Sequence, residues 1–221
     1  MIDFIRGQLI SIALVIFILG LIYQLIQFFR LTRKKEWVYP PLDVKAEKKT
    51  AGKWVSLCLA SLNGTMWKTD PQMTVMTSIF HVLLIAVPIF LLGHNMLLDQ
   101  AWGISLWSLP ESITDILTLV VLICVAFFLG RRLFLARVRA ITTLYDYIIL
   151  LIAVAPFLTG YFAYRQWFNY DTVITLHILA GEVMLITIPF TKLGHMLFFF
   201  LYRFFIGSEY SFAKGARAWT W

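Results

Sequence analysis

Cysteine is scarce in this chain of 221 residues, which has only Cys58 and Cys124. No CxxC or CxxCH motif occurs, so the sequence excludes a cysteine-ligated iron–sulfur cluster, covalent c-type haem attachment and a disulfide framework. The chain also lacks a nucleophile–base constellation and a phosphate-binding loop. These absences argue against catalysis on a soluble substrate.

Charge is also scarce, because Asp, Glu, Lys and Arg make up only 14% of the residues and hydrophobic residues make up 60%. The mean hydropathy is +0.80. A soluble domain is nearer half apolar, so this composition indicates an integral membrane protein in contact with lipid. The net charge of +7 comes from basic residues that follow the apolar segments. This pattern sets membrane topology, and we expect no nucleic-acid partner.

The apolar runs predict an all-α bundle of five transmembrane helices, which form a single domain over residues 1–221. About 20 apolar residues cross a bilayer as a helix. The predicted helices cover about residues 8–29, 74–98, 112–130, 141–164 and 172–202. Only Arg6 precedes the first run, and no small-residue cleavage site follows, so we interpret this run as a retained helix. Residues 30–73 are predicted to form a cytoplasmic or interfacial loop, and residues 203–221 a cytoplasmic tail that docks on a partner subunit.

Basic residues predict the orientation of these helices. Nine Lys or Arg residues lie in the segment 30–73 and four in the loop 131–139, whereas the opposite side has only Arg6 and Arg165. The positive-inside rule therefore predicts a periplasmic amino terminus and a cytoplasmic carboxyl terminus. The expected location is the bacterial inner (plasma) membrane, with several passes.

The chain contains only four histidines, and all of them lie in the second and fifth predicted helices: His81, His94, His177 and His195. A neutral imidazole in hydrocarbon is costly unless its ring nitrogens find partners. The two helices run in opposite directions, so depth pairs His81 with His195 near the cytoplasm and His94 with His177 near the outside. Facing imidazoles are what a six-coordinate haem iron requires, so we expect two b haems whose iron these histidines ligate.

Helical geometry favours this pairing on the fifth helix more than on the second. Eighteen residues at about 100° each return His177 and His195 to one face, whereas thirteen leave His81 and His94 about 140° apart. A kink or π-turn at Pro88 would close part of this gap. One haem with a surface His94 is the alternative, and four merely hydrogen-bonded histidines are another.

Several motifs resemble the respiratory nitrate reductase gamma-subunit family. They are Arg131–Ile152, the pairs Phe80-His81 and Gly93-His94, and the run Ile188–His195, within a resemblance over residues 80–203. The resemblance implies five helices and four histidines that ligate two b haems with the pairing above. Three features depart from this family: the histidines of the second helix are more widely spaced, the first cytoplasmic loop is longer, and no lysine lies between Lys68 and Lys192 to match its quinol-site lysine.

The chain more closely resembles the cytochrome b subunits of transmembrane redox complexes of sulfate reducers, the tetrahaem-cytochrome and high-molecular-weight cytochrome complexes. The motifs that carry this resemblance are Pro88–Phe90, His94-Asn95, Gly103–Leu106, Pro156–Gly160 and Arg203–Tyr210. It implies electron transfer between a periplasmic multihaem cytochrome c, or a quinone pool such as menaquinone, and cytoplasmic iron–sulfur subunits. A nitrate-reductase gamma subunit, a haem-free anchor and a Glu182-based transporter remain the alternatives.

Other polar residues within these segments are candidates for supporting roles. Glu182 lies about ten residues into the fifth helix, and an intramembrane carboxyl is a functional candidate. We expect Glu182 and Gly93 to belong to a quinone site, with Asp115 or Tyr161 near Glu182; a Glu182 hydrogen-bonded within the bundle is the simpler alternative.

Basic residues near the cytoplasmic ends are candidate partners of haem propionates. Arg131, Arg132 and Lys192 lie at the expected depth, and anionic propionates need charged partners. Ordinary positive-inside anchoring explains the same residues equally well. Asp146 has a simpler interpretation, because it lies at a helix start near Arg137 and Arg139, where the helix dipole and an arginine favour it.

Overall fold

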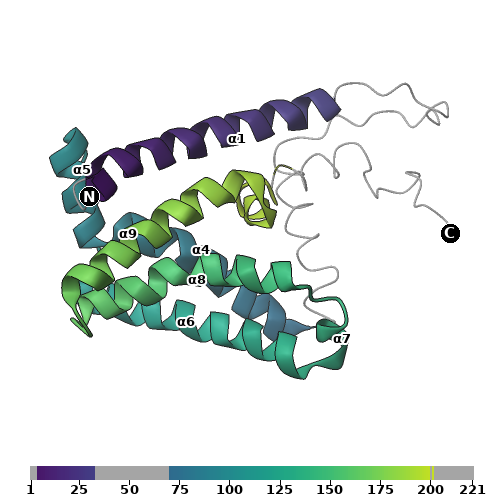
Figure 1. The fold of residues 1–221 in the computed structure, drawn as a ribbon. Helices are drawn as coiled ribbons and strands as arrows, with labels where there is room; N and C mark the ends of the chain where they lie inside the picture. Colours follow the sequence, from purple (N-terminus) through teal and green to yellow (C-terminus); the bar gives the residue numbers. More distant parts are fainter. Residues whose placement is uncertain (1–3, 33–69, 200, 202–221) are drawn as a thin grey trace, which may run out of the picture.

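The computed structural model describes residues 4–32, 70–199 and 201, and within these residues the chain is helical with no strand. Five helices are long and apolar enough to cross a membrane, which confirms the five predicted membrane segments. The predicted interfacial segment and the docking tail fall largely on residues 33–69 and 202–221, outside the described residues. The protein is therefore a multi-pass membrane protein (Figure 1).

The structure gives more elements than the five continuous helices predicted. In chain order they are η1 (Phe4–Leu9), α1 (Ile10–Thr32), α4 (Pro71–Phe90), α5 (Leu92–Trp102), α6 (Glu111–Phe134), α7 (Ala136–Arg139), α8 (Leu144–Tyr164), α9 (Tyr170–Thr187), η2 (Ile188–Phe190) and η3 (Lys192–Gly194). Residues 195–199 are again helical. The first, third and fourth predicted segments therefore correspond to α1, α6 and α8, whereas the second and the fifth are interrupted.

The second predicted segment breaks at Leu91, not at Pro88. The helix α4 continues through Pro88 to Phe90, and Leu91 then has extended backbone (φ −71°, ψ 127°). A helix end leaves its last carbonyls without intrahelical donors. Here the backbone N–H of Leu109 donates to the Phe90 carbonyl at 2.9 Å, and the ring of His94 contacts the Pro88 carbonyl at 2.9 Å. Donors from outside the helix therefore stabilise the break.

The fifth predicted segment breaks around Pro189. A proline inside a helix removes one backbone donor and clashes with the carbonyl four residues earlier. The α-helix α9 accordingly ends at Thr187 and gives way to the 3-10 turn η2, and Thr191 is extended (φ −126°, ψ −179°). A second 3-10 turn, η3, leads into the helical residues 195–199. His195 therefore lies beyond a break, as His94 does.

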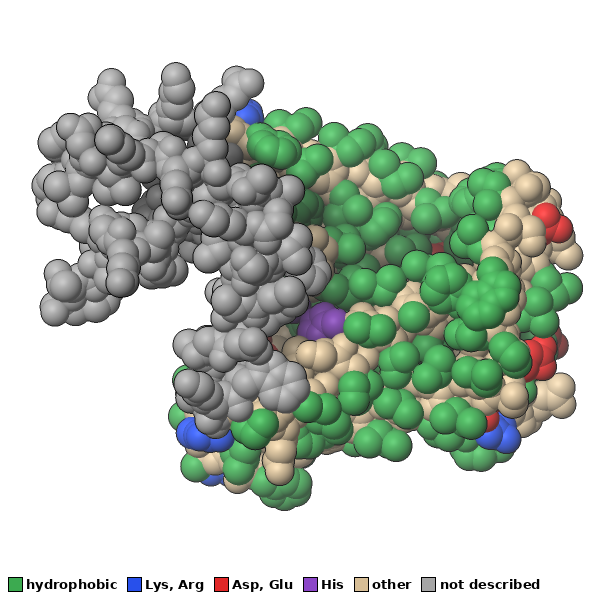
Figure 2. Space-filling model, turned by 180° about the vertical axis from the view of Figure 1, so that it is seen from behind, with side chains coloured by type: hydrophobic (Ala, Val, Ile, Leu, Met, Phe, Trp, Pro, Cys, Tyr) green, Lys and Arg blue, Asp and Glu red, His purple; other side chains and the backbone are tan. Residues whose placement is uncertain are grey.

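The membrane helices pack in the order α4, α6, α8, α9 and α1. The buried core joins the first three of these helices through Phe80, Leu84, Val87, Val121, Cys124, Val125, Phe128 and Phe157. Large apolar side chains also cover much of the outer surface, and Figure 2 shows them over the visible side of the bundle with charged side chains toward its ends. Such a surface suits contact with lipid.

The helix α1 packs on α9 and η2 through small residues. A Cβ atom placed on Gly20 would lie 2.6 Å from Cγ of Pro189, so only glycine permits this approach. The side-chain amide of Gln24 donates to the Pro189 carbonyl at 2.8 Å. Ala13, two turns before Gly20, is fully buried. Small residues at a helix–helix contact are the usual means of close packing in a membrane.

Asp70 connects α4 to α6 at one end of the bundle. Its carboxylate caps α4 by accepting from the Met73 N–H at 3.1 Å, and it pairs with the Arg131 guanidinium at 2.5 Å. The Met73 hydrogen bond, together with Arg131, holds the pKa of Asp70 below its usual value. Ionised Asp70 therefore stabilises the fold above the ordinary aspartate pKa of ~3.9, and this contribution is lost as the pH falls through the lower folded-state pKa.

We expect Asp70→Asn to lower the apparent unfolding temperature at neutral pH and to weaken its dependence on acid. Asparagine is as good an N-cap as aspartate, so the variant removes the ion pair with Arg131 while it retains the cap. The measurement is thermal unfolding in detergent at several pH values from neutral to acid. Asp99→Asn, at an exposed position in α5, is the control and should match the native protein. The same acid dependence in Asp70→Asn as in the native protein would contradict the prediction.

Candidate functional site

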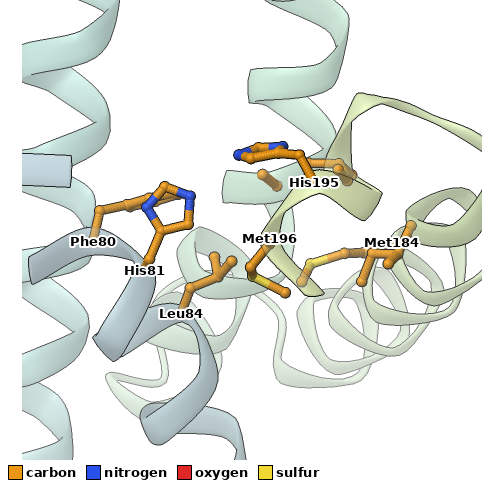
Figure 3. A pocket seen from close by; sticks show the side chains of 9 residues that line it. Phe80, His81, Leu84, Met184, His195 and Met196 are labelled. Atoms are coloured by element: carbon orange, nitrogen blue, oxygen red, sulfur yellow. The ribbon is translucent and has the colours of Figure 1, made fainter. Parts of the chain in front are cut away.

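The four histidines meet in two pairs. The ring centroids of His81 and His195 lie 5.6 Å apart with planes at 78°, and those of His94 and His177 lie 5.9 Å apart with planes at 19°. Figure 3 shows the first pair, with the two rings facing each other from different elements. These are the two pairs predicted from depth. In each pair one histidine belongs to a regular helix (His81 in α4, His177 in α9) and its partner follows a helix break.

Every histidine ring contacts a backbone carbonyl through Nδ1. The carbonyls belong to Thr77 for His81 (2.7 Å), Pro88 for His94 (2.9 Å), Pro156 for His177 (2.9 Å) and Lys192 for His195. A carbonyl oxygen only accepts, so Nδ1 must carry the proton in all four rings. In the neutral imidazole Nε2 is then unprotonated, and none of the four Nε2 atoms has a hydrogen-bond partner within the described part of the chain. A metal-ligating histidine typically has this arrangement.

The helix breaks position two of these rings, so the angular argument from continuous helices does not describe the structure. The break at Leu91 redirects the chain before His94, and this replaces the predicted kink at Pro88. The segment from Ile188 to Gly194 likewise interrupts the helix between His177 and His195. The predicted common face of a straight fifth helix was therefore wrong, although its two histidines still reach their predicted partners.

A small apolar cavity of about 40 Å³ lies beside the first pair (Figure 3). Besides the two histidines it is lined by Phe80, Leu84, Ala153, Met184, Ile188, Leu193 and Met196. These residues come from α4, α8, α9, η2, η3 and the helical residues 195–199, so the cavity lies where the fifth segment breaks. An apolar lining with a few polar groups is typical of a cofactor site.

Gly160 in α8 makes room for the ring of His177. A Cβ atom at Gly160 would lie 2.9 Å from Cε1 and 3.1 Å from Nδ1 of this ring. Pro156, one turn earlier, supplies the carbonyl that Nδ1 contacts, and the Thr159 hydroxyl lies 3.4 Å from the same nitrogen. Both Pro156 and Gly160 lie in a motif that carries the resemblance, but sequence reasoning assigned neither a role.

Two of the three predicted propionate partners have protein partners instead. Arg131 pairs with Asp70, and Lys192 pairs with Asp146 at 2.8 Å. The arginine partner expected for Asp146 was therefore wrong, because its cationic partner is Lys192, whereas Asp146 does lie in the first turn of α8 as predicted. Arg132 has no carboxylate partner among the described residues. Lys192 also provides the carbonyl that His195 contacts, so its ion pair joins the break before His195 to α8.

The predicted neighbours of Glu182 have other partners. Asp115 pairs with Arg165, whose guanidinium lies 5.4 Å from the Tyr161 ring centre. Glu182 itself is buried in α9. A Cβ atom added to Gly93 would meet nothing within 4 Å, so its surroundings are open.

The described residues bring no three His, Cys, Asp or Glu side chains together as a site for a bare metal ion. The histidines occur as pairs. A donor set of two suits a metal that brings its remaining ligands with it, as haem iron does.

Comparison with known proteins gives one informative relative. No family model matches the chain, and no solved structure matches it. A protein of Nitratidesulfovibrio vulgaris (strain Hildenborough) is 35% identical over 217 residues, which cover 96% of this chain and 94% of the relative. The name of that relative assigns it no function. At this identity and coverage, the chain belongs to the same family as the N. vulgaris protein.

Proposed function

We propose that this chain is a membrane subunit of a respiratory redox complex that holds two b haems and carries electrons across the bacterial inner membrane. Its outer partner would be a periplasmic multihaem cytochrome c or the quinone pool, for which menaquinone is the candidate. Its inner partner would be a cytoplasmic iron–sulfur subunit. In this proposal the amino terminus is periplasmic, and His81 and His195 lie on the cytoplasmic side.

One observation supports this proposal above the others: all four histidines of the chain form two facing pairs, and every Nδ1 atom is bonded to a carbonyl. A haem-free anchor needs its histidines to be hydrogen-bonded, but it has no need to bring them together in pairs or to leave four Nε2 atoms unpartnered. The pairs suit the binding of a metal, because the Nε2 atom of each ring is not bonded to the backbone and is free to act as a ligand.

The pair geometry agrees with a shared metal. Metal–imidazole bonds are about 2 Å long, so two imidazoles on opposite sides of one metal have ring centres about 6 Å apart. The observed separations are 5.6 and 5.9 Å. The cavity of about 40 Å³ is smaller than a porphyrin, so binding requires its lining to open. Met184 lines this cavity, and methionine is the side chain that adapts most easily to a new shape.

The chain would position two one-electron carriers at different depths of the membrane. His81 lies in the middle of α4, whereas His94 lies in α5 beyond the break at Leu91. Haem supplies the one-electron chemistry, and the histidines set its coordination and its place. The carbonyl contacts hold each imidazole in one tautomer.

The test is to purify the full chain from membranes, record a reduced-minus-oxidised spectrum and quantify haem per chain. We expect b-type, low-spin, six-coordinate spectra and two haems per chain. One haem would contradict the function of one pair, and single histidine variants would identify which pair is occupied. A folded preparation without haem would overturn the proposal and favour the membrane-anchor alternative.

A further inference from the structure

Glu182 is a buried carboxyl for which the histidine pairs provide no role. It is 3% exposed, and it is the only Asp, Glu, Lys or Arg among the buried described residues. Neither Oε1 nor Oε2 has a hydrogen-bond partner within the described residues. An intramembrane carboxylate with no partner is costly, and natural membrane proteins retain such groups where they carry function.

The helix α9, which carries Glu182, packs on α1 and α8. Glu182 lies five residues before the end of α9 at Thr187, and the 3-10 turn with Pro189 follows. Pro189 is the residue that Gly20 of α1 approaches. Ala13, seven residues before Gly20, is fully buried. Among the described residues, neither α1 nor α8 gives the Glu182 carboxyl a hydrogen-bond partner.

The histidine pair of α9 lies on another side of the same helix. His177 is five residues before Glu182, which corresponds to about 7.5 Å along the helix and about 140° around it. The carboxyl therefore lies close in depth to the outer pair without sharing its face. This arrangement disfavours the expected quinone site at Glu182, because a ligand at the outer histidine pair would be on the far side of α9.

We propose that Glu182 is a redox-linked proton site, an inference that rests on the proposed function. Glu182 takes one proton from water when one electron arrives from a reduced quinol, cytochrome c or iron–sulfur partner. It returns the proton to water when the electron leaves to the oxidised partner. The proton offsets the added electron, so the net charge inside the low-dielectric bundle does not change. Charges interact strongly there, which makes this compensation favourable.

No other described group provides a clear alternative at this level. The charged or titratable residues on the elements that pack against α9, and on α9 itself, are Arg6, Tyr23, Arg30, Tyr145, Asp146, Tyr147, Tyr161, Tyr164, Tyr170, Asp171 and His177. Asp146 is paired with Lys192, and Asp171 is exposed. His177 is one of the proposed ligands. Glu182 is thus the carboxyl on these elements that combines full burial with no partner.

The experiment is an equilibrium redox titration of the full haem-loaded chain at several pH values around neutrality. In the native protein we expect the potential of at least one haem to fall as pH rises, by up to ~59 mV per unit for one proton per electron. Glu182→Gln keeps the shape of the side chain and should flatten this slope. Asp171→Asn, on an exposed part of the same helix, is the matched control and should keep the native slope. An equal slope in Glu182→Gln and in the native protein would overturn the inference.

A second measurement uses the native protein, so its result does not depend on whether a variant folds. The reduced-minus-oxidised infrared spectrum of the native protein should contain a carboxyl C=O band that shifts in heavy water, because a carboxyl changes its protonation with the redox state. The band should disappear in Glu182→Gln where that variant is obtained. Two haems with no carboxyl band and with pH-independent potentials would overturn the proton site alone. A chain that binds no haem would overturn the proposed function as well.

Discussion

Replacing His195 with alanine should remove one haem and leave the other, so that haem content falls from two per chain to about one. His81 and His195 would hold this haem together, because the centroids of their rings lie 5.6 Å apart, and the loss of either imidazole would remove one of its two protein ligands. His81→Ala should therefore give the same loss. The pair of His94 and His177 should keep its haem, because it lies on other parts of the same segments. Haem quantification and the reduced-minus-oxidised spectrum of each purified variant test this prediction.

The control for this experiment is Met196→Leu. Met196 lines the same cavity and follows His195 directly, but its replacement keeps both imidazoles and much of the apolar volume. Volume-conserving apolar substitutions are usually well tolerated, so this variant should retain both haems. The double variant His81→Ala with His195→Ala should lose no more haem than either single variant. A double variant without any haem, or two single variants that lose different haems, would contradict the pairing.

The number of membrane helices and the histidine pairs were predictable because both follow from short-range properties of the chain. Apolar run length sets the number of spans. The second and fifth predicted helices cross the membrane in opposite directions, and this determines which of their histidines lie at the same depth. His81 and His195 face each other in the structure as depth alone indicates.

The helix breaks were less predictable, because their stability depends on contacts that sequence reasoning does not reveal. Pro88 suggested a kink, but the chain breaks at Leu91, where the N–H of Leu109 satisfies the carbonyl of Phe90. This donor is 19 residues away, near the end of the loop between α5 and α6. The straight fifth helix was wrong for a related reason, because Pro189 was interpreted only as part of a motif and not as a helix-breaking residue.

The partners of the charged residues were also not predictable from the sequence. The positive-inside pattern indicated the depth of Arg131 and Lys192, but it contained no information on their partners. Asp70 is 61 residues from Arg131, and Asp146 is 46 residues from Lys192. Both carboxylates therefore satisfy cations that sequence reasoning had assigned to propionates. Arg132 has no such partner among the described residues, and all three residues stay candidate propionate partners.

Gly160→Ala should displace the ring of His177 and reduce haem binding at the outer pair, while the inner pair keeps its haem. The added Cβ would lie 2.9 Å from Cε1 of His177, a distance at which the ring or the backbone must move. Inserting a methyl group into a packed site typically costs about 1–3 kcal/mol, which corresponds to a roughly 5- to 150-fold weaker site. The Nδ1 contact to the Pro156 carbonyl would be strained by the same movement.

The matched control is Gly181→Ala in α9, where an added Cβ would meet nothing within 4 Å. Both variants remove one glycine from a membrane helix and gain the same helix propensity, so a difference between them reports the contact with His177. Haem content and the retention of haem during dilution in detergent are the measurements. If Gly160→Ala and Gly181→Ala hold haem equally well, the ring of His177 does not need the space beside α8. In that case the outer haem, where present, must bind with the imidazole turned away from Pro156, and the carbonyl contact would not fix its tautomer.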